Sequence, residues 1–130
     1  MEFCVGVEKM LNCLLVGLGG FIGAVLRYLI SLIPIKNPES FPINTFIINT
    51  IGAFAIGCIA FAVSKNENID PKLLLFLRVG ICGGFTTFST FSLETAELIK
   101  GGSVLTAVIY VIFSIVVGVL AVMLPQLGLK

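Results

Sequence analysis

The sequence predicts an all-α integral membrane protein with four transmembrane helices. Hydrophobic residues make up 58% of the 130-residue chain and charged residues only 12%, and the mean hydropathy is +1.14. These values lie far outside the composition of soluble domains. A helix that crosses the hydrocarbon core needs roughly 20 mostly apolar residues, so a chain of this length allows about four spans. We therefore expect one small membrane domain that covers residues 1–130.

The apolar stretches and the polar turns between them define the four spans. The first runs from about residue 11 to 33 and is longer than the core of a signal peptide. The second covers about 41–63 and ends at the polar segment 64–71. The third extends from about 72 to 99, and a tight turn follows at 100–103. The fourth covers about 104–124 and ends at Pro125. Four spans place both chain ends on the same side of the membrane.

Composition excludes several classes of function. The net charge is only +1 and no run of basic residues occurs, which argues against nucleic-acid binding. The absence of histidine excludes the usual zinc sites and the His-dependent catalytic triads. The cysteines show no metal-ligand spacing and are expected to pack as small apolar side chains. They are Cys4, Cys13, Cys58 and Cys82. We therefore predict that the protein is not an enzyme.

The most distinctive segment is Gly83–Glu94, in which hydroxyls and phenylalanines alternate within the third span. Its two glycines are followed by two β-branched threonines, and both features lower helix propensity. The third helix is therefore expected to break here. Lipid tolerates the freed backbone groups only when protein covers them, when they line a watery cavity or when they bind an ion. The alternative is a glycine-mediated helix crossing whose hydroxyls bond to their own backbone.

Three of the expected spans carry strips of hydrogen-bond donors or aromatic edges at helical spacing. An amide N–H can replace part of an anion's hydration shell, and the electropositive rim of a phenyl ring lets an anion approach edge-on. The same side chains can instead join helices or face lipid and core. The strips are Phe88 and Phe91 beside Ser89 and Ser92, Thr45 and Asn49 with Asn44 adjacent, and Tyr110 and Ser114 with Gly118 one turn on.

Charged and small residues inside the spans lead to further expectations. Glu94 is open to a structural role or to proton coupling, and Arg27 and Arg78 are expected to extend toward the lipid headgroups. The spacing of Gly19 and Gly23, and that of Ala53 and Gly57, predicts close helix contacts. The positive charges that flank the spans differ little between the two sides, so insertion in both orientations is allowed. They are Lys9, Lys65, Lys72, Arg78 and Lys130 on the side of the termini and Arg27, Lys36 and Lys100 on the other.

Three sequence blocks resemble the Fluc or CrcB family of fluoride channels over nearly the whole chain. They are Gly19–Tyr28, Thr45–Asn49 with Gly52, and Gly83–Glu94. The resemblance implies an antiparallel, dual-topology homodimer in the plasma or inner cell membrane, with two fluoride pores and a structural sodium ion at the dimer interface. It also implies passive export of cytoplasmic fluoride down its electrochemical gradient, which would give the cell fluoride resistance.

The resemblance further implies roles for particular residues. The backbone carbonyls of Gly83 and Thr86, contributed by both subunits, are expected to hold the sodium ion, and its removal is expected to inactivate the pore. Gly118 stands where some family members carry a hydroxyl. The implied fluoride pathway comprises Thr45, Asn49, Phe88, Ser89, Thr90, Phe91, Tyr110 and Ser114.

Other functions also suit a chain of this kind. A small multidrug exporter of similar dual-topology build needs an acidic residue in its first span, and residues 11–33 contain none. A proton-coupled small-ion carrier would use Glu94 as its proton site. A purely structural membrane subunit would use the polar strips only as helix contacts. A second, different subunit also stays open, although the intact signature favours a self-sufficient homodimer.

Overall fold

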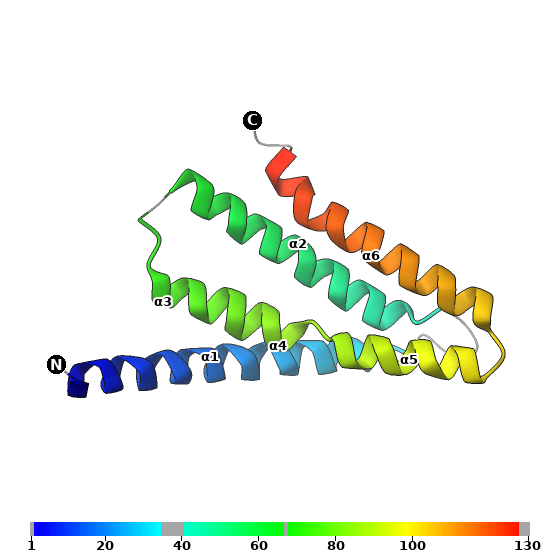
Figure 1. Cartoon of the computed structure of the whole chain (residues 1–130), viewed down its shortest axis with the longest axis horizontal. Coiled ribbons are helices and arrows are strands. Elements are labelled where there is room, and N and C mark those ends of the chain that lie inside the picture. The colour runs from blue at the N-terminus through cyan, green and yellow to red at the C-terminus, as the bar shows by residue number, and fades with distance from the viewer. Residues whose placement is uncertain (1, 35–40, 67, 128–130) are drawn as a thin grey trace.

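The computed structural model describes residues 2–34, 41–66 and 68–127, and this part of the chain is helical without strands. Four of its stretches are long and apolar enough to cross a membrane. Each stretch reverses the direction of the one before it, so the start of α1 and the end of α6 lie toward the same end of the bundle (Figure 1). The predicted all-α, four-span membrane fold is confirmed. The elements are α1 (Glu2–Ser31), α2 (Ile43–Lys65), α3 (Pro71–Leu74), the π-helix η1 (Leu75–Cys82), α4 (Gly83–Phe85), α5 (Phe88–Lys100) and α6 (Val104–Leu127).

The outer ends of the first and last helices extend beyond the predicted spans. α1 begins at Glu2 rather than near residue 11, because no proline interrupts residues 2–31 and the helical pattern continues into the polar N-terminal turns. α6 does not end at Pro125 but continues through it to Leu127. A proline so close to a helix end removes one backbone hydrogen bond without reversing the chain direction. Lys36 and Lys130 lie outside the described residues.

The helices associate chiefly as two pairs. α1 lies along η1 and α4, α2 lies along α6, and α5 packs on α6. Small residues permit this close approach. A Cβ atom on Gly19 would lie 2.5 Å from the carbonyl oxygen of Phe76, and one on Gly57 would overlap the carbonyl oxygen of Val122. A Cβ on Gly23 would overlap the carbonyl oxygen of Ile81. The predicted close contacts at these three glycines are confirmed.

The third span breaks at Thr86 and Thr87, just after the two glycines. Thr86 (φ −77°, ψ 156°) and Thr87 (φ −147°, ψ 115°) have extended backbones, whereas Gly83 is helical (φ −65°, ψ −38°). Gly84 serves helix packing, because a Cβ there would overlap the carbonyl oxygen of Gly20 in α1. The predicted break is present, but its unwound residues are the threonines rather than the glycines.

The described connections follow the expected turn chemistry. At the end of α5, Gly102 has a φ of 83°, its N–H donates to Ile99 O over 3.1 Å, and Ser103 N–H donates to Leu98 O over 2.8 Å. This is a Schellman motif, in which a glycine suits the left-handed residue. At the start of α3, Asp70 Oδ1 accepts a hydrogen bond from Lys72 N–H over 2.8 Å. Both turns return the chain sharply into the next span.

Candidate functional site

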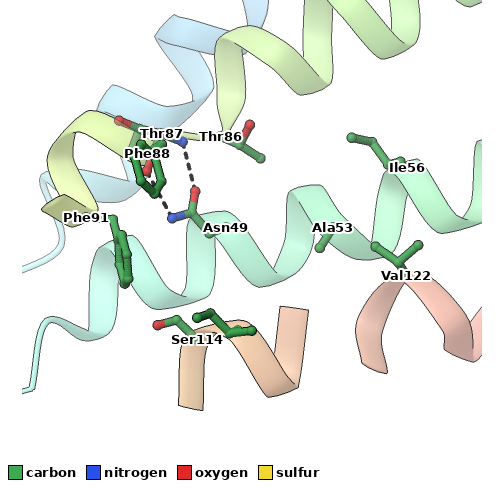
Figure 2. Close-up of a pocket in the computed structure, with 10 residues that line it drawn as sticks. Asn49, Ala53, Ile56, Thr86, Thr87, Phe88, Phe91, Ser114 and Val122 are labelled. Carbon is green, nitrogen blue, oxygen red and sulfur yellow. Dashed lines mark hydrogen bonds between the residues drawn. The ribbon is translucent and has the colours of Figure 1, made fainter. Parts of the chain in front are cut away.

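Asn49 of α2 bridges the break in the third span. The N–H of Thr87 donates to Asn49 Oδ1 over 2.8 Å, and Asn49 Nδ2 donates to Thr87 O over 3.1 Å (Figure 2). These two bonds compensate the backbone groups that the break removes from the helix, as a membrane interior requires. An asparagine amide has two N–H donors. Only one is used here, so the other is available within the described part of the chain.

A groove of ≈ 410 Å³ surrounds this amide between α2, α6 and the break. Phe88 and Phe91 line it from α5, with ring centroids 5.9 Å apart and ring planes inclined at 37°. Ser114 lines it from α6, and its buried Oγ has no hydrogen-bond partner among the described residues. Donors and aromatic rings from three helices therefore meet in one groove. Its other lining residues are Ala53, Ile56, Thr86, Thr87, Ile115 and Val122.

Thr87 also organises the start of α5. Its Oγ1 accepts a hydrogen bond from Thr90 N–H over 3.2 Å, which makes it the N-cap of the helix. The same oxygen lies 3.0 Å from Thr90 Oγ1 and 3.3 Å from Ser89 Oγ. Ser89 and Thr90 are thus held beside the groove without lining it. Thr87 was missing from the predicted site, although a threonine directly before a resumed helix is a recognisable N-cap signal.

Glu94 joins three helices through a separate buried network. Thr45 Oγ1 donates to Glu94 Oε1 over 2.7 Å, and the Tyr110 hydroxyl donates to Glu94 Oε2 over 2.8 Å. Thr45 and Tyr110 are buried, with exposed fractions of 4% and 0%, and neither lines the groove. The ring of Phe91 lies 5.0 Å from that of Tyr110, centroid to centroid, and links the network to the groove. A conducting role for Thr45 and Tyr110 stays a prediction.

Carbonyl oxygens at the end of a helix lack helical donors, and those of Gly83 and Thr86 are two of the group at this break. In a continuous helix the N–H of Thr87 would donate to Gly83 O, and the N–H of Thr90 would donate to Thr86 O. These N–H groups donate instead to Asn49 Oδ1 and to Thr87 Oγ1. The described residues include no cluster of three or more His, Cys, Asp or Glu side chains that could hold a metal ion. The oxygens at the break are those of backbone carbonyls, of hydroxyls and of the Asn49 amide.

Other residues singled out in the sequence lie away from the groove. Asn44 Nδ2 donates to Ile33 O over 3.0 Å and to Ser31 O over 3.4 Å, so this side chain fastens the end of α1. Arg27 is half-buried on α1, and its Nε has no hydrogen-bond partner among the described residues. Nothing lies within 4 Å of the position of a Cβ on Gly118. The structure therefore brings only some of the predicted site residues together in the groove of Asn49.

An aromatic cluster supports the Tyr110 end of the site. The ring of Phe41 lies 5.1 Å from that of Tyr110 and 5.4 Å from that of Phe46, and both pairs are edge-to-face. Phe113 stacks on Phe46 at 5.3 Å. Sequence reasoning missed these rings, because Phe41 precedes its helix and no single periodicity relates it to residues of α6.

The fold and the groove define a small multi-pass membrane protein whose interrupted span is lined by hydrogen-bond donors. The family described as "CrcB-like protein, Camphor Resistance (CrcB)" matches residues 14–126. The chain belongs to this family. The predicted family is thus confirmed, and with it the prediction of a transport protein rather than an enzyme.

Individual relatives match nearly end to end. The fluoride-specific ion channel FluC of Ruminiclostridium cellulolyticum is 44% identical over 125 residues, which cover 95% of this chain and 96% of the relative. That of Azobacteroides pseudotrichonymphae is 43% identical over 111 residues, or 85% and 89% of the two chains. That of Clostridium perfringens is 42% identical over 121 residues, or 92% and 94%.

Proposed function

We propose that this chain forms a fluoride-selective channel that exports cytoplasmic fluoride passively down its electrochemical gradient. One observation carries the proposal: a single groove combines an unused N–H of Asn49, the unpartnered hydroxyl of Ser114 and the rings of Phe88 and Phe91. The names of the relatives as fluoride-specific ion channels support it. A role in fluoride resistance at the cell membrane is part of this proposal.

The chemistry of the groove suits a small and strongly hydrated anion. Such an ion enters a narrow path only if protein donors replace its water, and it leaves only if each site is weak. None of the described residues that line the groove of Asn49 is charged, so none of them creates a deep well there. The Asn49 amide and the Ser114 hydroxyl offer neutral donors, and the phenyl rims of Phe88 and Phe91 offer a positive edge. The groove therefore favours the passage of an anion over its tight binding.

The channel is proposed to work as an antiparallel homodimer with a structural sodium ion at its centre. The carbonyls of Gly83 and Thr86 would hold this ion, and they suit it because both have lost their helical donors and because hard cations prefer oxygen ligands. A bound cation would supply positive charge that makes the interior less hostile to an anion. The Phe88 side chain beside the break is 79% exposed in the single chain. This exposed ring supports the presence of a second subunit at the break.

Efflux from liposomes tests the function. Purified protein, checked for dimer assembly, is reconstituted with internal fluoride or chloride, and a fluoride- or chloride-selective electrode follows release in sodium buffer with a potassium ionophore. We expect rapid fluoride loss with little chloride loss. Protein-free liposomes and the variant Asn49→Leu serve as controls. Correctly assembled dimers that release no fluoride, or that release both anions equally, would contradict a selective fluoride channel.

A further inference from the structure

Arg78 is a cation within the membrane-spanning part of the third span. It lies in η1 and its side chain is exposed. The nearest described acidic residues along the chain are otherwise engaged. Asp70 caps α3 through Lys72 N–H, and Glu94 accepts hydrogen bonds on both of its oxygens from Thr45 and Tyr110. A charged residue inside a span without a structural partner is a candidate for function.

Arg78 lines a hollow that adjoins the groove of Asn49. This second hollow has a volume of ≈ 360 Å³, and its other lining residues are Ile56, Pro71, Leu74, Leu75 and Val79. Ile56 also lines the groove of Asn49, so the two hollows meet at this residue. Asn49, Ala53 and Ile56 follow one another along α2 (Figure 2). The two hollows therefore follow one another along α2 with Ile56 as a shared wall, and we call the pair the α2 track, from the break to the end of the bundle where α3 begins.

The charge distribution along the α2 track is uneven. Among the described residues, Arg78 is the one charged residue that lines either hollow. It stands near the polar connection before α3, whereas the donors and rings of the groove are uncharged. Ile56 lies seven residues after Asn49, which corresponds to about 10 Å along an α-helix. Apolar walls concentrate the field of a fixed charge, and such fields raise local concentrations of oppositely charged ions.

We propose that Arg78 recruits fluoride to the α2 track by raising the anion concentration at the end nearest α3. The inference rests on the proposed function, since it assigns a kinetic role within that same pathway. The guanidinium is exposed rather than enclosed, so it attracts the anion without holding it in place. Arg78 should therefore govern how fast fluoride enters at low concentration rather than the maximal rate through the groove.

The test compares Arg78→Gln with Arg78→Lys and with Lys65→Gln in the full-length protein in liposomes. Lys65 ends α2 on the same side of the bundle, lies 5.5 Å from the centroid of the Phe61 ring and lines neither hollow. Initial fluoride efflux is measured against internal fluoride at constant ionic strength. We expect Arg78→Gln to lower the rate at low fluoride by about tenfold, with the maximal rate unchanged. Arg78→Lys should restore the rate and Lys65→Gln should leave it unchanged.

Three results would overturn the inference. Equal rates for Arg78→Gln and wild type at all concentrations would show that the charge does not matter. If Arg78→Gln lowered the efflux rate equally at low and at saturating fluoride, and Arg78→Lys did not restore it, the arginine would have a structural role. An effect that disappears in vesicles of purely zwitterionic lipid would assign the arginine to the surface charge of anionic lipid. Raising the ionic strength should shrink the difference if recruitment is correct. Wild-type protein without fluoride flux would overturn the proposed function itself, which distinguishes that failure from the other three.

Discussion

The methyl group of Thr86 lies directly against the backbone of Gly52, where any Cβ atom would overlap it. The hydroxyl of the same threonine donates to Cys82 O over 2.9 Å, and its N–H donates to the same oxygen over 3.0 Å. Thr86 is thus fixed by its methyl, its hydroxyl and its amide. Since Asn49 of the same helix holds Thr87, α2 positions both unwound residues of the third span.

Gly52→Ala should displace the break. The added methyl overlaps the Thr86 methyl, so we expect a loss of stability of about 1–3 kcal/mol together with a loss of fluoride flux. Adding Thr86→Ser removes the opposing methyl, keeps the hydroxyl and should restore both. Thermal stability and efflux measure the result, and Gly118→Ala, where nothing lies within 4 Å, is the matched control. Equal damage in the single and double variants would show that this contact is not the cause.

Asn49→Leu should abolish flux by removing both bonds to Thr87. The unpaired backbone groups of Thr87 would cost about 1–3 kcal/mol each if buried, so we expect a less stable protein as well as an inactive one. Asn49→Asp retains the acceptor for Thr87 N–H but lacks the N–H donors, so it should fold better than Asn49→Leu and still fail to conduct. Efflux and size-exclusion chromatography separate the two effects. An active Asn49→Asp channel would remove the amide from the mechanism.

Phe88→Ile and Phe91→Ile should both reduce flux strongly, but with different effects on the fold. Phe88 is 79% exposed, so its replacement should change the stability of the single chain by less than about 0.5 kcal/mol. Phe91 packs on Tyr110 and should be more sensitive. Phe54→Ile, on the part of α2 that faces a different groove, is the control. Full fluoride flux in both variants would show that neither phenyl ring is needed in the fluoride pathway.

Glu94→Gln distinguishes a structural carboxylate from a proton site. A glutamine keeps one acceptor for Thr45 or Tyr110, so we expect a modest stability loss of about 1–2 kcal/mol with fluoride flux that still follows its own gradient. In the wild type, imposing a proton gradient across the liposomes should leave the fluoride flux unchanged once the membrane potential is clamped. A flux driven uphill by protons, and lost in Glu94→Gln, would identify a proton-coupled carrier instead.

Removal of sodium should inactivate the pore. Liposomes are prepared and assayed in the large organic cation N-methyl-D-glucamine on both sides, after dialysis to remove residual sodium. We expect fluoride efflux to fall to the background of protein-free liposomes and to return when sodium is added. Sustained flux in thoroughly sodium-free buffer would contradict a sodium ion held by Gly83 and Thr86.

Much of the fold follows from the sequence for clear physical reasons. Apolar stretches of membrane length have few alternatives to helices, because lipid leaves no other way to satisfy the backbone. The small residues at Gly19, Gly23 and Gly57 likewise predicted close contacts, since small side chains let helix backbones approach one another. The extension of α6 through Pro125 was not predicted. The proline predicted a helix end, but a proline in the last turn costs only one backbone hydrogen bond and the helix can continue past it.

The site was harder to predict than the fold, because it depends on contacts between residues that are far apart in the sequence. Helical spacing placed Thr45 and Asn49 on one face of α2, but it could not show that Thr45 bonds to Glu94 whereas Asn49 bonds to Thr87. These partners lie 49 and 38 residues away along the chain, respectively. Which donor meets which acceptor depends on the relative rotation of packed helices, and one sequence does not specify that rotation.

The interruption at Thr86 and Thr87 also divides one membrane-crossing helix into two shorter ones. Each of the two has its own helix dipole, and one end of each dipole lies at the break. The segment that finishes at Phe85 presents the negative end of its dipole, and α5 presents the positive end of its own from Phe88 onward. A single break thus sets a region that favours cations beside one that favours anions. At this break, the partial charges of the two helix ends favour ions of opposite sign without any ionised side chain.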